Sequence, residues 1–108
     1  MNWLDLLAYF VGGAFLANTV PHFVAGIMGR AFQSPFAKPP GEGLSSSRVN
    51  VLWGFANLVL SYLLTCHVGS FDLRSWPDAV AIGLGMLILA VLMSTHFGRF
   101  NGGNLDRP

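Results

Sequence analysis

Four polar side chains stand out because each interrupts a long apolar stretch that contains no charged residue. Asn18 and His22 lie four positions apart, so they share one face of a regular helix. Asn57 and His96 lie in two later apolar stretches, and Asn50 precedes Asn57 by one heptad. Asparagine and histidine can hydrogen-bond between helices, and histidine can also carry a proton or ligate a metal. We therefore treat Asn18, His22, Asn57 and His96 as a candidate polar cluster.

Three kinds of chemistry are open to this cluster. The first is structural, because such side chains routinely hydrogen-bond across helices in a membrane. The second is a ligand or transport site in which His22 gains and loses a proton. The third is haem or metal ligation by His22 and His96, although the chain has no C-x-x-C-H motif and two histidines are too few for zinc. We predict the structural role, with no bound metal or cofactor.

Patterns that would indicate catalysis are missing from the sequence. A Ser-His-Asp triad needs a buried carboxylate, but every Asp and Glu falls at or beyond the edge of an apolar stretch. The Gly- and Ser-rich segment before Arg48 lacks the G-x-x-x-x-G-K-[ST] spacing of a phosphate loop. A proton-coupled pump usually needs a carboxylate inside the membrane. We therefore predict that the chain is not an enzyme.

The distribution of charge predicts the elements that position the cluster. The chain has 108 residues, of which 53% are hydrophobic and 10% are charged. This composition excludes a disordered chain, and a net charge of +1 argues against nucleic-acid binding. Residues 6–29, 49–71 and 79–98 carry no charge, and each interval is long enough as a helix to cross a hydrocarbon core of roughly 30 Å. The predicted fold is an all-α integral membrane bundle of three transmembrane helices.

The predicted boundaries make one transmembrane domain over residues 1–108. The helices are expected at about residues 4–29, 48–69 and 77–98. Pro21 lacks a backbone N–H and should kink the first helix. The loop at 30–47 contains several prolines and glycines that forbid a continuous helix, and residues 99–108 are expected to form a flexible tail.

Small residues recur four positions apart, which lets helix backbones approach closely. The candidate packing residues are Gly12, Gly26, Gly29, Gly83 and Gly85. Their faces exceed what three helices can cover, so we predict a structural or accessory subunit in a homo-oligomer or with other membrane protein subunits. One alternative is an oligomeric channel or transporter built around Asn18, His22 and Asn57. Another is a haem-binding electron-transfer subunit.

The orientation prediction depends on the six Lys and Arg residues of the chain. Five of them lie in the first loop or after the third span, and only Arg74 lies between the second and third spans. Because Lys and Arg favour the cytoplasmic side, we predict an outer N-terminus and a cytoplasmic C-terminus. The lipid bilayer is then the first partner, and a bacterial inner (plasma) membrane is the predicted location.

Overall fold

A computed structural model describes residues 2–105 and contains three long helices. Helix α1 runs over Trp3–Ile27, α2 over Ser47–Cys66 and α3 over Trp76–Asn101. Each helix is long and apolar enough to span a membrane. The prediction of three apolar helices is therefore confirmed, whereas insertion into a membrane and the kink at Pro21 stay predictions.

Local capping explains where α1 begins and ends. The side chain of Asn2 accepts a hydrogen bond of 2.9 Å from the backbone N–H of Leu4, which satisfies one free donor of the first turn. At the other end Gly29 has a φ of 75°, a left-handed conformation that glycine adopts readily. The N–H of Arg30 then closes the turn on the carbonyl of Ala25 at 2.9 Å. Gly29 thus ends the helix instead of packing within it, and α1 stops at Ile27 and not at residue 29.

The ends of the other two helices also differ from their expected positions. Ser46 caps α2 by accepting a hydrogen bond of 3.2 Å from the N–H of Val49, so the helix starts at Ser47. Helix α2 ends at Cys66, ahead of Gly69 with its φ of 58°, and so before the expected residue 69. Helix α3 continues to Asn101, where Gly102 forms a left-handed cap. Residues 99–101 are therefore helical and not part of the tail, and residues 106–108 lie outside the described part of the chain.

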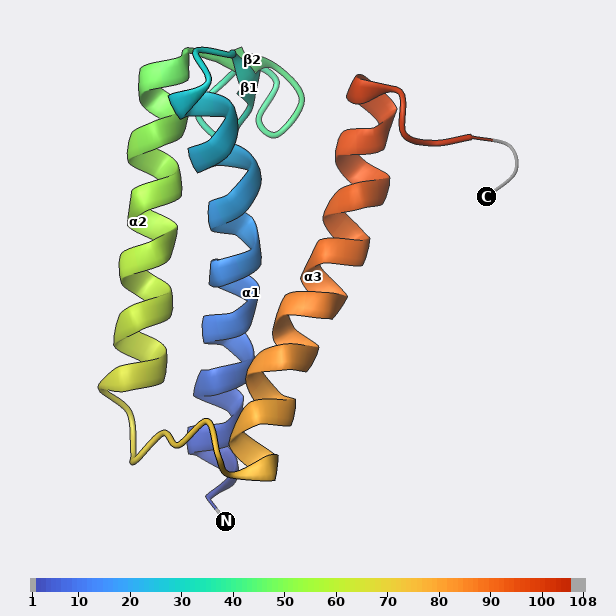
Figure 1. Ribbon diagram of the computed structural model, residues 1–108. Helices are drawn as coiled ribbons and strands as arrows, with labels where there is room; N and C mark the ends of the chain where they lie inside the picture. The colour runs from blue at the N-terminus through green and yellow to red at the C-terminus, as the bar shows by residue number, and fades with distance from the viewer. Residues whose placement is uncertain (1, 106–108) are drawn as a thin grey trace.

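A two-stranded hairpin forms within the first loop. Strand β1, Phe32–Gln33, pairs antiparallel with β2, Leu44–Ser45, so that Phe32 faces Ser45. The sequence predicts only that this loop is not a continuous helix, and the structure adds two short strands to it. We call the end of the molecule that carries them the hairpin end. It also holds the end of α1, the start of α2 and the end of α3 (Figure 1).

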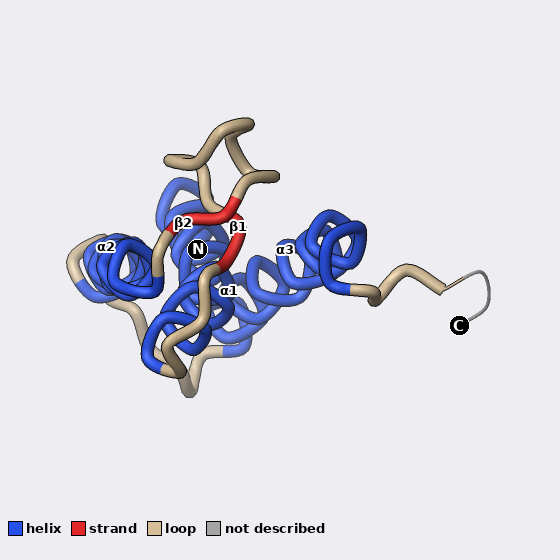
Figure 2. The backbone as a smooth tube through the Cα atoms, turned by 90° about the horizontal axis from the view of Figure 1, so that it is seen from above, coloured by secondary structure: helices blue, strands red, loops and turns tan. Residues whose placement is uncertain are grey.

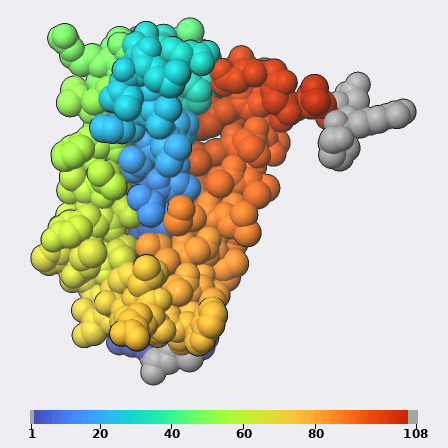
Figure 3. Space-filling view, in the orientation of Figure 1, coloured from blue at the N-terminus to red at the C-terminus, as the bar shows by residue number. Residues whose placement is uncertain are grey.

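Helix α1 is the central element of the bundle. It packs against both other helices, and α2 and α3 lie on opposite sides of it (Figures 1 and 2). Helices α1 and α2 run side by side over their full length. Helix α3 is close to α1 at the end away from the hairpin, and the two helices diverge toward the hairpin end. The space-filling view shows α1 in blue between α2 in green and α3 in orange (Figure 3).

Glycines allow α1 and α2 to approach closely over their full length. A Cβ atom at Gly54 would lie 2.6 Å from the backbone nitrogen of Phe23. A Cβ atom at Gly12 would lie 2.6 Å from the hydroxyl of Thr65, closer to the other end. A Cβ atom at Gly26 would lie 2.7 Å from the carbonyl oxygen of Ser47. Side chains at these positions would force the two helices apart.

The contact between α1 and α3 is close only in the half away from the hairpin. There a Cβ atom at Gly13 would overlap the carbonyl of Ile82, and one at Gly85 would overlap the carbonyl of Phe10. Toward the hairpin end the ring of Phe32 lies 4.8 Å from that of Phe97, so β1 places an aromatic side chain against α3. The change from glycines to aromatic rings accounts for the divergence of α3 from α1.

Candidate functional site

Asn18 and Asn57 meet at the interface between α1 and α2. The Asn18 side-chain amide donates to Oδ1 of Asn57 at 2.9 Å, and Asn57 is fully buried. The amide of Asn57 donates in turn to the carbonyl of Trp53 at 2.7 Å, within its own helix. One turn further along α2, Ser61 donates to the carbonyl of Gly12 at 2.7 Å. These bonds fix the axial position of α1 against α2 at two depths.

His22 and Asn50 form the second polar contact of the same interface. Nδ1 of His22 lies 2.8 Å from Oδ1 of Asn50, and His22 is only 2% exposed. The side-chain amide nitrogen of Asn50 lies 3.0–3.2 Å from the carbonyls of Phe32, Ser45 and Ser46. Carbonyls can only accept, so the amide nitrogen faces them and Oδ1 faces His22. Nδ1 of His22 therefore donates its proton to Asn50.

Asn50 also belongs to this cluster, although the sequence did not predict it as a member. It is fully buried and connects α1, the start of α2 and both strands of the hairpin. The sequence carried one signal, because Asn50 lies a heptad before Asn57 and so on nearly the same face of α2. Its position near the end of the helix suggested a surface residue. The hairpin covers it, and the hairpin was not foreseen.

Among the described residues, His96 bonds to the hairpin loop and not to the other three predicted residues. Its Nε2 atom lies 2.6 Å from the carbonyl oxygen of Gly41, in the loop of the hairpin. The ring of Phe97 is in edge contact with both imidazoles, at 5.9 Å from His22 and 5.1 Å from His96. Both imidazoles line one small cavity, but Nδ1 of His22 and Nε2 of His96 are already hydrogen-bonded to the chain. The geometry gives no support to a haem held between them.

A small cavity of about 130 Å³, with both polar and apolar side chains in its lining, lies next to this cluster. Its lining includes His22, Asn18, Trp53 and His96. The indole N–H of Trp53 is buried and has no hydrogen-bond partner among residues 2–105. Nε2 of His22 is also without a protein partner in that range, and it can accept because Nδ1 carries the proton. The cavity has room for about four water molecules, and water can both accept from Trp53 and donate to His22.

The predicted packing glycines fall into three groups. Gly12 and Gly26 lie against α2, and Gly85 lies against α1. Gly29 lies in the turn that ends α1, and a Cβ atom there would meet nothing within 4 Å. Gly83 is exposed on α3, and a Cβ atom there would meet nothing within 4 Å. Most of the small-residue contacts are therefore used within the chain, and Gly83 is left unpacked.

Comparisons with known proteins add no constraint on function. No protein-family model, curated protein or solved structure matches the chain. Within residues 2–105, no group of three His, Cys, Asp or Glu residues is arranged to hold a metal ion. The described residues of the site form a hydrogen-bonded network that joins α1, α2 and the hairpin.

Proposed function

We propose that this chain is a small, non-enzymatic multi-pass integral membrane protein that acts as a structural or accessory subunit. It associates with further copies of itself or with other membrane protein subunits through the outer face of α3. Its hairpin end faces the cytoplasm of a bacterium, as the distribution of Lys and Arg favours.

The unequal burial of the three helices carries this proposal. Of the most apolar 18-residue stretch of each helix, 33% is buried in α1, 28% in α2 and 6% in α3. Along α3, Leu84, Ile88 and Val91 are exposed at spacings of four and three residues. This spacing forms one continuous apolar seam along a helix, the form that a packed transmembrane helix requires. Helix α3 thus has the largest surface available for a partner helix.

The polar cluster supports a structural role and not a catalytic one. Asn18, Asn57 and Asn50 use their side-chain amides on partners within the chain. His22 and His96 each make a hydrogen bond to the chain as well. Groups that are already paired in this way stabilise one arrangement of α1, α2 and the hairpin. That arrangement holds α3 in position for its partner.

Native mass spectrometry of the protein, extracted gently from its own membrane, tests the proposal. We expect a mass that is a multiple of 11.7 kDa or that includes another chain. Replacing Leu84, Ile88 and Val91 together by alanine should lower the association constant by about tenfold, which corresponds to about 1.4 kcal/mol of association free energy. The side chains removed are exposed, so the isolated chain should keep its fold.

The matched control is the same triple replacement on the outer face of α2, at Leu52, Phe55 and Val59, which are also exposed. We expect this variant to assemble as the unaltered protein does. A protein that is monomeric when extracted would overturn the proposal. Equal loss of assembly in both triple variants would overturn the assignment of the interface to α3.

A further inference from the structure

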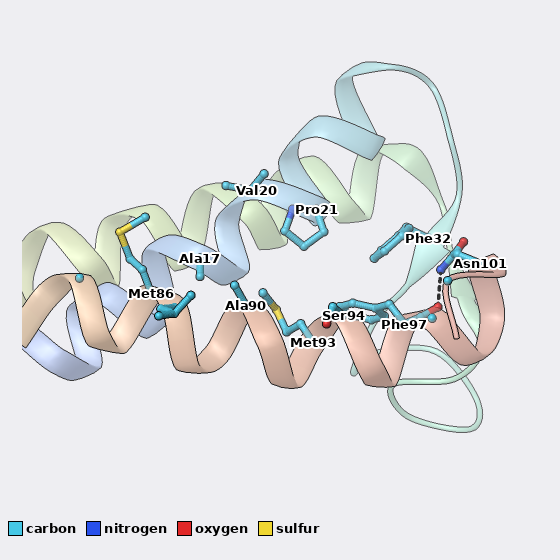
Figure 4. A pocket seen from close by; sticks show the side chains of 14 residues that line it. Ala17, Val20, Pro21, Phe32, Met86, Ala90, Met93, Ser94, Phe97 and Asn101 are labelled. Atoms are coloured by element: carbon cyan, nitrogen blue, oxygen red, sulfur yellow. Dashed lines mark hydrogen bonds between the residues drawn. The ribbon is translucent and has the colours of Figure 1, made fainter. Parts of the chain in front are cut away.

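An open apolar groove separates α1 from α3 in the half of the bundle near the hairpin. Its volume is about 850 Å³. Figure 4 shows Ala17, Val20 and Pro21 of α1 on one side, with Ala90 and Met93 among the α3 side chains on the other. The groove exists because the rings of the hairpin end hold α3 away from α1. It opens along the side of the bundle, where a bilayer would surround the helices.

The groove continues toward the hairpin end and reaches a cation there. A second hollow of about 390 Å³ shares Val20, Pro21, Phe32 and Asn101 with the first, and Arg30 is part of its lining. Arg30 follows the end of α1, at the level where a membrane surface would lie. Together the two hollows extend from the middle of α1 to Arg30.

Among the described residues, no carboxylate forms an ion pair with Arg30. Within the described residues the one ion pair joins Arg99 to Glu42 at 3.5 Å, and Arg30 takes no part in it. A guanidinium group presents paired N–H donors that match the oxygens of a phosphate. Basic pockets between transmembrane helices at the cytoplasmic side bind the headgroups of anionic lipids for this reason.

We propose that this groove binds one anionic phospholipid, with its phosphate on Arg30 and an acyl chain between α1 and α3. The proposal assumes that the helices span a membrane, but it does not depend on the oligomeric interface of α3. Methionine side chains such as Met86 and Met93 adapt to a flexible hydrocarbon chain.

The lining of the groove suits a hydrocarbon chain. It is almost entirely apolar along α1 and α3, and the hollow that continues it brings in the charged residue Arg30. A single hydrocarbon chain can enter the groove and follow it to Arg30. The bound lipid would then fill the gap that the aromatic rings leave between α1 and α3.

The test titrates delipidated protein with lipids and counts bound lipid by native mass spectrometry. Dioleoyl phosphatidylglycerol is compared with dioleoyl phosphatidylcholine, which has the same acyl chains without net charge. We expect the anionic lipid to bind at least tenfold more tightly. Arg30→Gln should remove this preference, whereas Arg48→Gln, which removes one exposed charge at the same end of the molecule, should keep it.

A second variant tests the groove itself. Ala90 is exposed and lines the groove, so Ala90→Phe should fill it without disturbing the packed parts of the fold. We expect this variant to bind both lipids at least tenfold more weakly, with unchanged helix content by circular dichroism. Inorganic phosphate alone should not bind, because the acyl chain supplies most of the contact.

Four results would overturn the proposal. They are equal affinity for the two lipids, equal loss of preference in the Arg30 and Arg48 variants, full lipid binding by Ala90→Phe, and binding of inorganic phosphate as tight as that of the anionic lipid. The last result would assign Arg30 to a free-phosphate site. None of these measurements depends on assembly, so the lipid site and the subunit role can fail separately.

Discussion

Helix α1 has two neighbours, and its interfaces with them are built from different residues. Toward α2, glycines lie near both ends of the interface, and hydrogen bonds from Asn18, His22 and Ser61 join the helices between them. Toward α3, glycines bring the backbones together only in one half. In the other half, Phe32 and Phe97 stand between the helices. Close approach allows short polar side chains to reach across, whereas large rings keep the helices apart and leave a groove.

The two interfaces therefore differ in how firmly they hold their helices together. The α1–α2 interface, with the hairpin joined to it by Asn50, is fixed by directional bonds to buried groups. Near the hairpin, the hydrogen bonds of α3 within residues 2–105 go to the hairpin and its loop and not to α1, through His96, Arg99 and Asn101. The first interface determines the fold, and the second leaves surface available for lipid and for partner chains.

The largest effect should come from a side chain added at the α1–α2 interface. Gly54→Leu places a side chain against the backbone of Phe23, which cannot move aside as a flexible side chain could. We expect the free energy of unfolding to fall by about 3 kcal/mol, at the upper end of overpacking effects. Unfolding in detergent micelles, followed by circular dichroism, measures this loss.

The same substitution on α3 is the control. Gly83 has open space around it, so Gly83→Leu should change the free energy of unfolding by less than about 0.5 kcal/mol. Equal losses in the two variants would contradict the view that the α1–α2 interface carries most of the stability.

A smaller effect should follow from removal of the amide at Asn50. Asn50→Ala leaves buried carbonyls of the hairpin and the N–H of His22 without a partner. We expect a loss of about 2 kcal/mol, as for unsatisfied buried groups in general. Asn101→Ala, which removes an exposed amide at the end of α3, should cost about 0.5 kcal/mol in the same unfolding assay. A larger loss at Asn101 than at Asn50 would reverse the comparison.

The sequence predicted the three helices because charge-free intervals and helix length are local properties. It also placed Asn18 and Asn57 in one candidate polar cluster, and the structure joins them directly. It could not predict the role of Asn50, whose partners come from a hairpin that closes over the helix end. Nor could it tell Gly83 from Gly85, since two residues so close in sequence face different surroundings only once α1 is placed.

The smallest effect should come from the ion pair that joins the end of α3 to the hairpin loop. Arg99 lies 3.5 Å from Glu42, with the two side chains 57% and 41% exposed. Water and salt screen such a pair, so Arg99→Gln should lower the free energy of unfolding by less than about 0.5 kcal/mol, and high salt should abolish even that difference. The unfolding assay at low and high ionic strength measures both. A loss of 2 kcal/mol or more would mean that α3 is held at the hairpin end as firmly as α2 is held to α1, and the distinction between the two interfaces would not stand.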